Sequence, residues 1–430
     1  MKRINLLLFL SIFLVFLGCS SDGETVEEPN PESEEPQQEE PTPDETNSAP
    51  NAFALIGIAD ESMNTELSPS FSWEEATDSD GDNVVYDLYL DDSGNPTTLI
   101  VEGLSETEYS FDIRLDYAKE YFWKVVAKDD KGNQTESGVF SFQTVGLFSK
   151  AELTNDFPVR TDFSSVVYNG KLWLIGGKRA TDRVYYSEDG LTWEFATVFT
   201  QFRYVESHTS LVYDDKAWVI GGYYRTSSPS EEVWSSTDVF TWEQATNSAE
   251  FGELIFHSSV VFDDKIWVIG GFIYAQIQDG VYNSIDGTSW EKVETMGLPK
   301  IGRQKSVVFD DKIWLIGGSI ESGRTNGIWN SSDGESWEKV GDGPFSSRYY
   351  HSVAVFNNKI WLVGGYDSGS KSFLNDVWSS NDGINWVKES VPETFEARGN
   401  HELIEFNGKL WILGGQGDGF DPLSTVWTIN

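Results

Sequence analysis

The sequence predicts an all-β protein in which a six-bladed β-propeller follows a smaller β-sandwich. A unit of 45 to 50 residues recurs six times after residue 146, as expected for propeller blades. Short apolar runs with a period of two, separated by turn residues, fill residues 51–145. The 430-residue chain is also 14% aromatic and contains 39 glycines, a composition typical of strands joined by tight turns. This length exceeds a single ordinary core and indicates several domains.

The N-terminal residues 1–19 have the pattern of a lipoprotein signal peptide. Residues 1–3 are Met-Lys-Arg, and the apolar segment 4–17 has the length of a signal-peptide core but is too short for a membrane span. The segment ends at Gly18-Cys19, which resembles a bacterial lipobox, and Cys19 is the only cysteine. We therefore expect acyl chains on Cys19 to anchor the protein to the bacterial outer membrane, most simply on the cell surface. Periplasmic and outward-facing anchoring both remain open.

Residues 20–50 predict an acidic, disordered linker. Residues 22–46 contain eleven acidic residues and no basic residue, and the whole chain carries a formal charge of −40. Such a segment cannot bury a core, and like charges keep it extended. The acidic chain repels phosphate backbones, which excludes nucleic acid as a partner class. We expect a monomer held away from the membrane by this linker.

Residues 51–145 predict a β-sandwich of about seven strands. The spacing resembles that of a fibronectin type III domain, in which Trp73 and Trp123 would lie in the core. The strongest strand patterns cover residues 70–73, 84–90, 121–127 and 138–144.

An acidic turn within the sandwich leaves a calcium site open. Asp78, Asp80 and Asp82 alternate there, and clustered carboxylates suit Ca²⁺. The distal glutamate of an EF-hand loop is missing, so a hairpin turn is the favoured interpretation.

Residues 146–430 consist of six copies of one pattern. Each copy has a tryptophan three residues before a Gly-Gly pair, and most copies then carry a Ser-x-Asp-Gly-x-x-Trp turn. Four short strands per copy make a propeller blade. The pattern resembles the kelch repeat of galactose oxidase-like propellers, and this resemblance implies a six-bladed ring. The Gly-Gly pairs begin at residues 176, 221, 270, 317, 364 and 414.

The two ends of the repeat region predict how the ring closes. The sixth copy stops at Asn430, one strand short, while residues 148–160 match residues 386–398 in length. We expect the N-terminal segment to supply the missing outer strand, which also removes an exposed edge. Fifteen of the 17 tryptophans occupy repeat positions, which indicates packing between blades.

The candidate ligand-binding residues lie on the face that carries the long, variable loops. Arg160, Arg348 and Arg398 each stand sixteen residues before a Gly-Gly pair, in neighbouring blades. We expect them to meet on one side of the central opening, where guanidinium groups bind carboxylates. The alternative is that each arginine pairs with a nearby carboxylate for structural reasons. The residues expected to face the cluster or lie at its rim are Arg203, Glu206, Glu253 and Tyr349.

A second repeat position, thirteen residues before each Gly-Gly pair, holds all four histidines of the chain. His351 and His401 are the two next to the arginine cluster and are candidate ligand-binding residues. A metal or acid–base ring is conceivable, but the Phe and Gln at the same position in other blades favour a structural role. We predict no metal site and no cofactor. The full set is Phe163, His208, His257, Gln304, His351 and His401.

These observations favour a binding module for a carbohydrate, including acidic glycans, or for a protein ligand. The alternative is an enzyme, since N-acetylneuraminate epimerase, a sialic-acid mutarotase, is similar in being a secreted kelch ring, but no motif carries over residue by residue. Galactose oxidase chemistry is disfavoured because its copper site needs a cysteine cross-linked to tyrosine, and Cys19 is the only cysteine. A purely structural surface protein is the third class. Whether the protein is an enzyme stays open, with the balance against it.

Overall fold

The computed structural model describes residues 47–111, 114–178, 183–197, 201–202, 204–224 and 228–430. The signal peptide, Cys19 and all but the last four residues of the linker lie outside this part of the chain. Regular structure within it consists of β-strands and one short 3₁₀ turn, η1 (Asp418–Phe420). None of the described helical segments is long and apolar enough to cross a membrane.

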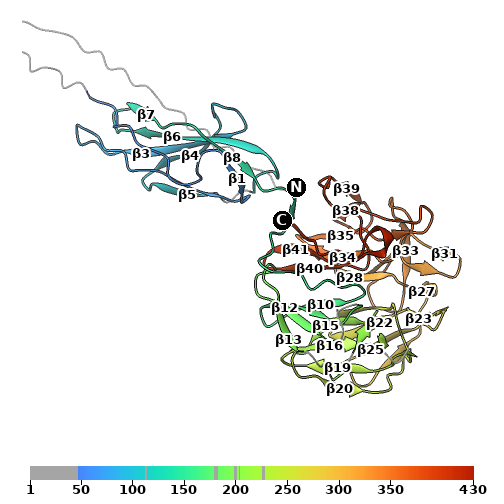
Figure 1. Ribbon diagram of the computed structural model, residues 1–430. Helices are drawn as coiled ribbons and strands as arrows, with labels where there is room; N and C mark the ends of the chain where they lie inside the picture. The colour runs from blue at the N-terminus through green and yellow to red at the C-terminus, as the bar shows by residue number, and fades with distance from the viewer. Residues whose placement is uncertain (1–46, 112–113, 179–182, 198–200, 203, 225–227) are drawn as a thin grey trace, which may run out of the picture. The chain divides into compact units, whose positions relative to one another are not determined.

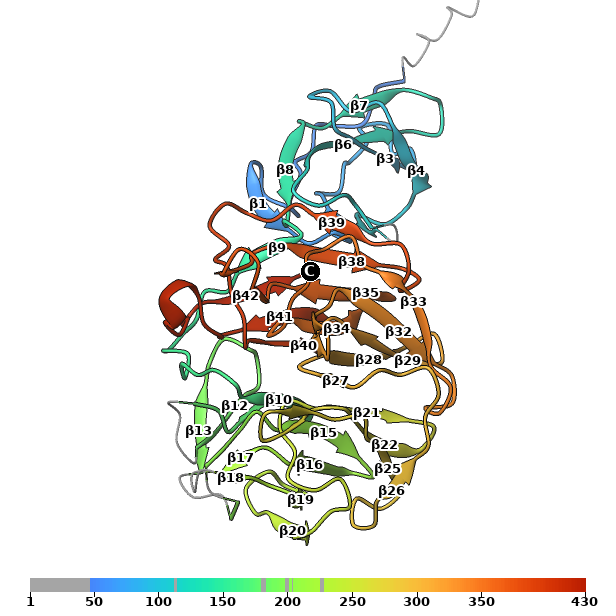
Figure 2. The same cartoon turned by 90° about the vertical axis from the view of Figure 1, so that its right-hand side faces the viewer.

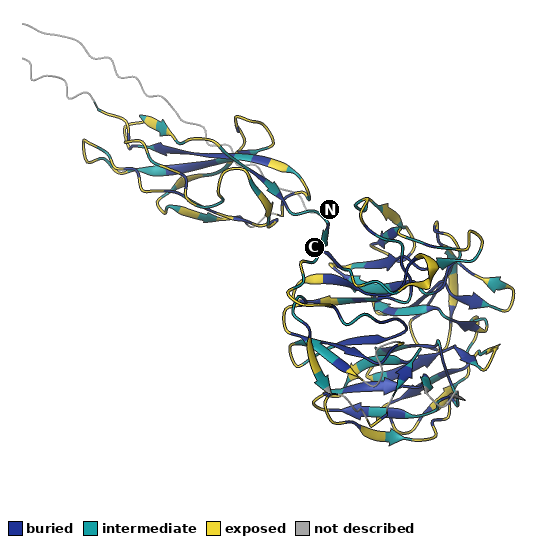
Figure 3. Cartoon of the chain, in the orientation of Figure 1, coloured by how far each residue is buried: buried dark blue, intermediate teal, exposed yellow. Residues whose placement is uncertain are grey.

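The first folded body is a two-sheet β-sandwich. Its larger sheet has the order β1-β8-β6-β3-β4, with β7 paired to β6, and its smaller sheet is β2-β5. Trp73 and Trp123 are buried between the sheets, as predicted, and the burial colours show this interior (Figure 3). The strands are β1 (Ser62–Thr65), β2 (Ser70–Ser72), β3 (Val85–Asp91), β4 (Leu99–Leu104), β5 (Glu108–Ser110), β6 (Glu120–Lys128), β7 (Gln134–Glu136) and β8 (Phe140–Thr144).

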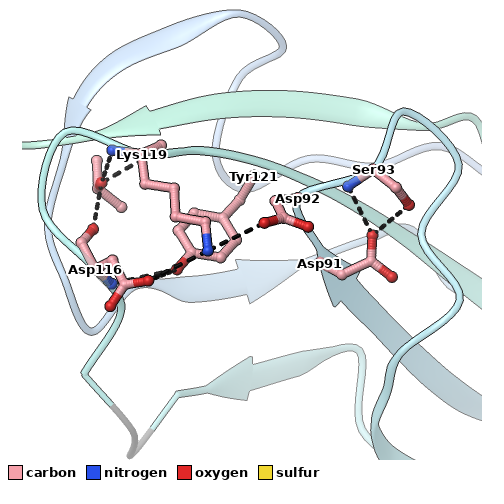
Figure 4. A network of polar contacts seen from close by, with 7 residues as sticks. Asp91, Asp92, Ser93, Asp116, Lys119 and Tyr121 are labelled. Carbon is pink, nitrogen blue, oxygen red and sulfur yellow. Dashed lines mark hydrogen bonds and ion pairs between the residues drawn. The ribbon is translucent and has the colours of Figure 1, made fainter.

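Polar contacts fix the turn that follows β3 (Figure 4). Asp91 accepts hydrogen bonds from the amide and hydroxyl of Ser93, and these bonds, with the amides of the turn, hold the pKa of Asp91 well below its usual range. The Lys119 Nζ lies 3.1 Å from Asp92 Oδ2 and 3.2 Å from Asp116 Oδ2. These ion pairs tie the turn to the segment that leads into β6.

The acidic turn at residues 78–82 is organised by hydrogen bonds of its own. Asp78 Oδ1 accepts the amide of Asp80 at 2.8 Å, and Asp82 Oδ1 lies 3.7 Å from Lys131 Nζ. The described residues contain no group of three or more His, Cys, Asp or Glu side chains arranged to hold a metal ion.

The second folded body is a ring of six four-stranded antiparallel blades (Figures 1 and 2). The innermost strands pack side by side around the ring in the order β10-β15-β21-β28-β34-β40, and β40 packs against β10. Blades 1 to 3 contain β10 (Ser164–Tyr168), β11 (Lys171–Ile175), β12 (Val184–Ser187), β13 (Glu194–Thr197); β15 (Thr209–Tyr213), β16 (Lys216–Ile220), β19 (Val233–Ser236), β20 (Glu243–Thr246); and β21 (Ser258–Phe262), β22 (Lys265–Ile269), β25 (Val281–Ser284), β26 (Glu291–Val293).

The remaining blades have the same plan. They contain β28 (Lys305–Phe309), β29 (Lys312–Ile316), β32 (Gly327–Ser331), β33 (Glu338–Asp342); β34 (Ser352–Phe356), β35 (Lys359–Val363), β38 (Val377–Ser380), β39 (Val387–Glu389); and β40 (Glu402–Phe406), β41 (Lys409–Leu413), β42 (Val426–Ile429), β9 (Phe148–Lys150). Short hairpins in the long loops, such as β36 (Tyr366–Asp367) with β37 (Ser372–Phe373), decorate the loop face.

The ring closes through its N-terminal strand, as the sequence predicted. Strand β9 pairs antiparallel with β42, with Phe148 opposite Ile429, and lies beside it in Figure 2. Phe148 is buried against Phe395 and the neighbouring apolar side chains of the fifth and sixth blades. The two ends of the propeller therefore share one blade, and β9 pairs with the strand β42 that would otherwise be its outer edge.

The repeated tryptophans connect one blade to the next, which confirms their predicted structural role. The Nε1 atom of each tryptophan before a Gly-Gly pair donates to the carbonyl five residues earlier, at 2.9 to 3.1 Å. The rings of four of them, Trp218, Trp267, Trp314 and Trp411, also cover an Asp-Gly turn of the neighbouring blade. A Cβ on Gly383, for example, would lie 2.4 Å from Cζ3 of Trp314. The turn glycine is thus required by both its left-handed backbone and this close approach.

Candidate functional site

A polar cavity opens at the centre of the ring, on the face of the long loops. Its open space totals about 530 Å³ including the solvent-facing mouth, and all six blades contribute to its lining. The outer layer, which we call the mouth ring, is the residue fourteen positions before each Gly-Gly pair. It consists of Asp162, Ser207, Phe256, Arg303, Tyr350 and Asn400.

All six residues of the mouth ring have a left-handed backbone, with φ between 52° and 64°. This conformation is uncommon for residues other than glycine and costs roughly 1 kcal/mol or more each. Backbone hydrogen bonds between blades hold it. The amide of Ser207 donates to the carbonyl of Asp162 at 3.0 Å, and the amide of Arg303 donates to the carbonyl of Phe256 at 2.8 Å. Phe256 bonds to Ser207 at 3.1 Å and Asn400 to Tyr350 at 2.8 Å in the same way.

Below the mouth ring lies the layer that contains the histidines. The His208 Nε2 is 2.7 Å from Ser164 Oγ of the preceding blade, and His351 Nε2 donates to the carbonyl of Ile316 at 3.0 Å. Gln304 makes the equivalent bond, from Nε2 to the carbonyl of Ile269 at 2.7 Å. Burial lowers the pKa of His208, His257 and His351 from 6.5 to about 3 and that of His401 well below 6.5. These side chains are neutral and join neighbouring blades.

Glycine is required at the Gly-Gly pairs because the histidine layer packs directly on them. A Cβ on Gly176 would lie 2.8 Å from Cε1 of His208, which comes from the next blade. A Cβ on Gly222 would lie 2.6 Å from the Cβ of the same histidine. Such distances leave no room for a side chain at either glycine. The first glycine contacts a side chain of the neighbouring blade, and the second contacts the inner strand of its own blade.

An acid and a base lie deeper in the cavity, at the start of two inner strands. Lys305 Nζ is 3.7 Å from Glu402 Oε1, and Ser165 Oγ donates to Glu402 Oε2 at 3.2 Å. Burial raises the pKa of Glu402, although Lys305 and Ser165 oppose that shift. The floor of the cavity therefore holds a carboxyl group that can carry a proton closer to neutral pH than an ordinary glutamate.

Arg303 is the strongest cationic feature of the mouth. Its guanidinium carbon lies 4.7 Å from the ring centre of Phe256, 4.8 Å from that of Phe272, 5.3 Å from that of Tyr349 and 5.7 Å from that of Tyr350. No ion pair in the described part of the chain involves Arg303, and its Nε is buried without a hydrogen-bond partner. Aromatic faces hold the cation in place without neutralising it.

The opposite side of the mouth is acidic but already paired. Lys178 Nζ lies 3.1 Å from Asp162 Oδ2 and 3.6 Å from Glu206 Oε1. The hydroxyl of Tyr204 also donates to Glu206. Glu206 was expected to face the arginine cluster, and it instead stabilises Lys178 beside the mouth ring.

The expectation that Arg160, Arg348 and Arg398 form one pocket is not what the structure shows. All three side chains are fully buried, none lines the cavity, and each donates from Nη1 to the carbonyl of the first glycine of its own blade. Arg348 pairs with Asp376 and Arg398 with Glu396. The sixteen-residue spacing places these arginines inside their blades and outside the cavity lining, which agrees with the structural alternative.

Arg160 differs from the other two because no carboxylate in the described residues pairs with it. Its Nε donates to the carbonyl of Pro158 at 3.1 Å, and its guanidinium lies 4.9 Å from the ring centre of Tyr185. Burial lowers its pKa to about 9, and Nη2 is buried without a hydrogen-bond partner.

The other predicted site residues divide between the cavity and its surroundings. His351 and His401 line the cavity, and Tyr349 belongs to the aromatic group around Arg303. Glu253 lies on the loop face, where it bonds to the hydroxyl of Tyr274 and raises the pKa of that tyrosine. Arg203 lies outside the described residues.

The sequence comparison agrees with this architecture. A family model described as the KLHDC2/KLHL20/DRC7 Kelch-repeats domain matches residues 256–430. The propeller is of the kelch type. Among solved structures, the one titled "Structure of YjhT" superposes with a TM-score of 0.55 at 16% identity. The match covers 64% of this chain and 96% of that chain. At this identity the likeness concerns the fold of the kelch propeller alone. No curated protein matches the sequence.

Proposed function

We propose that the kelch propeller is a binding module that takes an acidic sugar into its central cavity. The observation that carries this proposal is Arg303, an unneutralised guanidinium held by aromatic rings at the mouth. A guanidinium fork binds a planar carboxylate through two parallel hydrogen bonds. In a chain of net charge −40, an anion would be repelled without such a local cation.

The rest of the mouth ring suits a sugar. Ser207 and Asn400 offer a hydroxyl and an amide to sugar hydroxyl groups, and Phe256 and Tyr350 offer aromatic surface to an apolar sugar face. Few polar groups on a partly aromatic wall are typical of small-molecule sites.

The N-terminal pattern supports a place for this module on the cell surface. A lipidated Cys19 followed by the acidic segment 22–46 would hold the propeller outside the outer membrane as a monomeric receptor. Capture of extracellular acidic glycans is the activity that such an anchor would serve.

A second candidate is catalysis on the bound sugar, in the manner of a sialic-acid mutarotase. The observation that favours it is Glu402, whose raised pKa and place beside Lys305 suit general acid–base chemistry. Accelerated interconversion of the anomers of N-acetylneuraminic acid, followed by NMR and lost in Glu402→Gln, would establish this activity.

Binding is tested by calorimetry on the full-length protein purified in detergent. N-acetylneuraminic acid and glucuronic acid serve as probes, and lactose serves as an uncharged sugar. We expect saturable binding of at least one acid and a loss of at least tenfold in affinity for Arg303→Gln. Arg183→Gln, which removes an exposed arginine elsewhere on the ring, is the matched control. Equal binding by wild type and Arg303→Gln would refute the proposal.

A further inference from the structure

A continuous line of aromatic rings leads from the central cavity to an exposed loop of the sixth blade. We call Phe256, Tyr350, Tyr349, Tyr366 and Phe420 the aromatic track. Successive ring centres along it are 6.2, 4.4, 5.6 and 6.0 Å apart. Its inner end is the mouth ring, and its outer end is the 3₁₀ turn η1.

The middle of the track is fixed by backbone pairing. The amide of Tyr366 donates to the carbonyl of Tyr349 at 2.7 Å, and the amide of Tyr349 donates back at 3.3 Å. Phe373 is buried beside the outer rings, with its ring centre 5.1 Å from that of Tyr366 and 5.3 Å from that of Phe420. The loop therefore has a small apolar core of its own that supports the track.

Phe420 is exposed to solvent although it is a large apolar residue, and its backbone conformation is unfavourable for residues other than glycine. Its side chain is 55% exposed, and its backbone is left-handed with φ of 60°. Bonds from the amide of Gly417 to the carbonyl of Asp421, and from the amide of Phe420 to the carbonyl of Gly417, close the turn that presents it. Strained backbone conformations and exposed apolar side chains both occur preferentially at binding sites.

Within the described ranges, the cation–π contacts of the track occur at its inner part. The guanidinium of Arg303 lies 5.3 Å, and that of Arg324 4.7 Å, from the ring centre of Tyr349. No ion pair involves Arg324 within the described ranges, and it is exposed. Further out, the rings of Tyr366 and Phe420 contact other aromatic rings, and no cation–π contact among the described residues involves them.

We infer that the ligand is an oligosaccharide that ends in an acidic sugar, with the neutral sugars behind it lying over Tyr366 and Phe420. This inference rests on the proposed function of the cavity. Carboxylates belong where the cations are, and the C–H faces of neutral pyranose rings pack on uncharged aromatic rings. The order along the track, cationic inside and purely aromatic outside, matches a chain with the acid at its terminus.

The test compares a single acidic sugar with a chain that ends in it. Full-length protein in detergent is titrated with N-acetylneuraminic acid and with 3′-sialyllactose, which adds two neutral sugars. We expect Phe420→Ala to weaken 3′-sialyllactose binding about tenfold and to leave N-acetylneuraminic acid binding unchanged. Tyr274→Ala, another exposed aromatic residue on the loop face, is the matched control and should change neither affinity.

The outcomes separate this inference from the proposed function. If wild type binds both sugars equally well and Phe420→Ala changes neither, the track is refuted while the cavity stands. If neither sugar binds, a parallel titration with glucuronic acid and its β-1,4-linked disaccharide with N-acetylglucosamine repeats the comparison for uronic acids. Failure of all four probes overturns the cavity and the track together. A thermal melt of Phe420→Ala that matches wild type confirms that the variant is folded.

Discussion

Arg348 and Asp376 form a bidentate ion pair inside the fifth blade. Nη1 lies 2.6 Å from Oδ1 and Nη2 lies 2.8 Å from Oδ2, and the arginine side chain is fully buried. Trp378 Nε1 also donates to Asp376 at 2.8 Å. The carboxylate thus neutralises a charge that would otherwise be stranded in the blade.

Removing this carboxylate should destabilise the propeller strongly. We expect Asp376→Ala to cost about 3–5 kcal/mol in the free energy of unfolding, because it leaves a buried guanidinium unpaired. The double variant Arg348→Leu with Asp376→Leu should lose less, since no charge remains to be buried. Urea denaturation of the three proteins checks the order, and a double variant less stable than Asp376→Ala would contradict it.

Two glycines with almost the same backbone conformation allow the cost of backbone strain to be measured apart from the cost of steric crowding. Gly383 has φ of 72° and would place a Cβ against Trp314, whereas Gly408 has φ of 70° and no atom within 4 Å of a Cβ. We expect Gly408→Ala to cost about 1–2 kcal/mol for its left-handed conformation alone. Gly383→Ala should cost clearly more, because the tryptophan must also shift. Equal losses in chemical denaturation would show that the turn accommodates the ring.

The buried histidines should make the ring sensitive to mild acid. The pKa of His208, His257 and His351 falls from 6.5 in the unfolded chain to about 3 in the folded one, and that of His401 falls well below 6.5, so below pH 6.5 the unfolded state binds more protons. Stability is therefore lost as the pH falls from 6.5 toward 3. Gln304 shows that Gln fits this position. A variant with Gln in place of His208, His257, His351 and His401 should therefore lose less of its melting temperature between pH 6.5 and 5 than wild type does. If the melting temperature of the variant falls with pH as steeply as that of wild type, the acid sensitivity comes from carboxylates instead.

The closing strand should be important for the whole ring although it contains three residues. We expect Phe148→Ala to cost about 3–5 kcal/mol, because the side chain is buried between the fifth and sixth blades. Lys150→Ala changes an exposed residue of the same strand and should be nearly neutral. Calorimetric melts of the two variants check this, and a similar melting temperature for both would mean that the ring closes without the N-terminal segment.

The ring could be predicted from the sequence because its contacts repeat. Most Gly-Gly pairs meet the histidine layer of the next blade, and four of the tryptophans before them cover an Asp-Gly turn there, so the same physical requirements recur around the ring. The ring closure followed from counting strands at the two ends. Two sandwich strands were also predictable, because the apolar runs 84–90 and 121–127 fall on β3 and β6, where Leu88 and Trp123 are buried.

The site was harder to predict because its residues share no side-chain type. The mouth ring changes from Asp to Ser, Phe, Arg, Tyr and Asn, and the signal that could have revealed it is its place directly before the position that holds the four histidines. The prediction of an arginine pocket was wrong for the opposite reason. The common spacing of the arginines is visible in the sequence, but that of their carboxylate partners is not. Asp376 lies 28 residues after Arg348, whereas Glu396 lies two residues before Arg398.

The backbone of the mouth ring has a consequence for how the opening of the cavity could change during evolution. Bonds between amides and carbonyls hold the backbone of these six residues, so the path of the chain at the opening does not depend on hydrogen bonds of their side chains. The left-handed conformation disfavours β-branched residues, and none of the six is Val, Ile or Thr. Within that restriction, single substitutions can exchange charge, size or hydrogen-bonding capacity at the opening. A gene encoding this ring can therefore explore new ligand specificities one codon at a time without first rebuilding its scaffold.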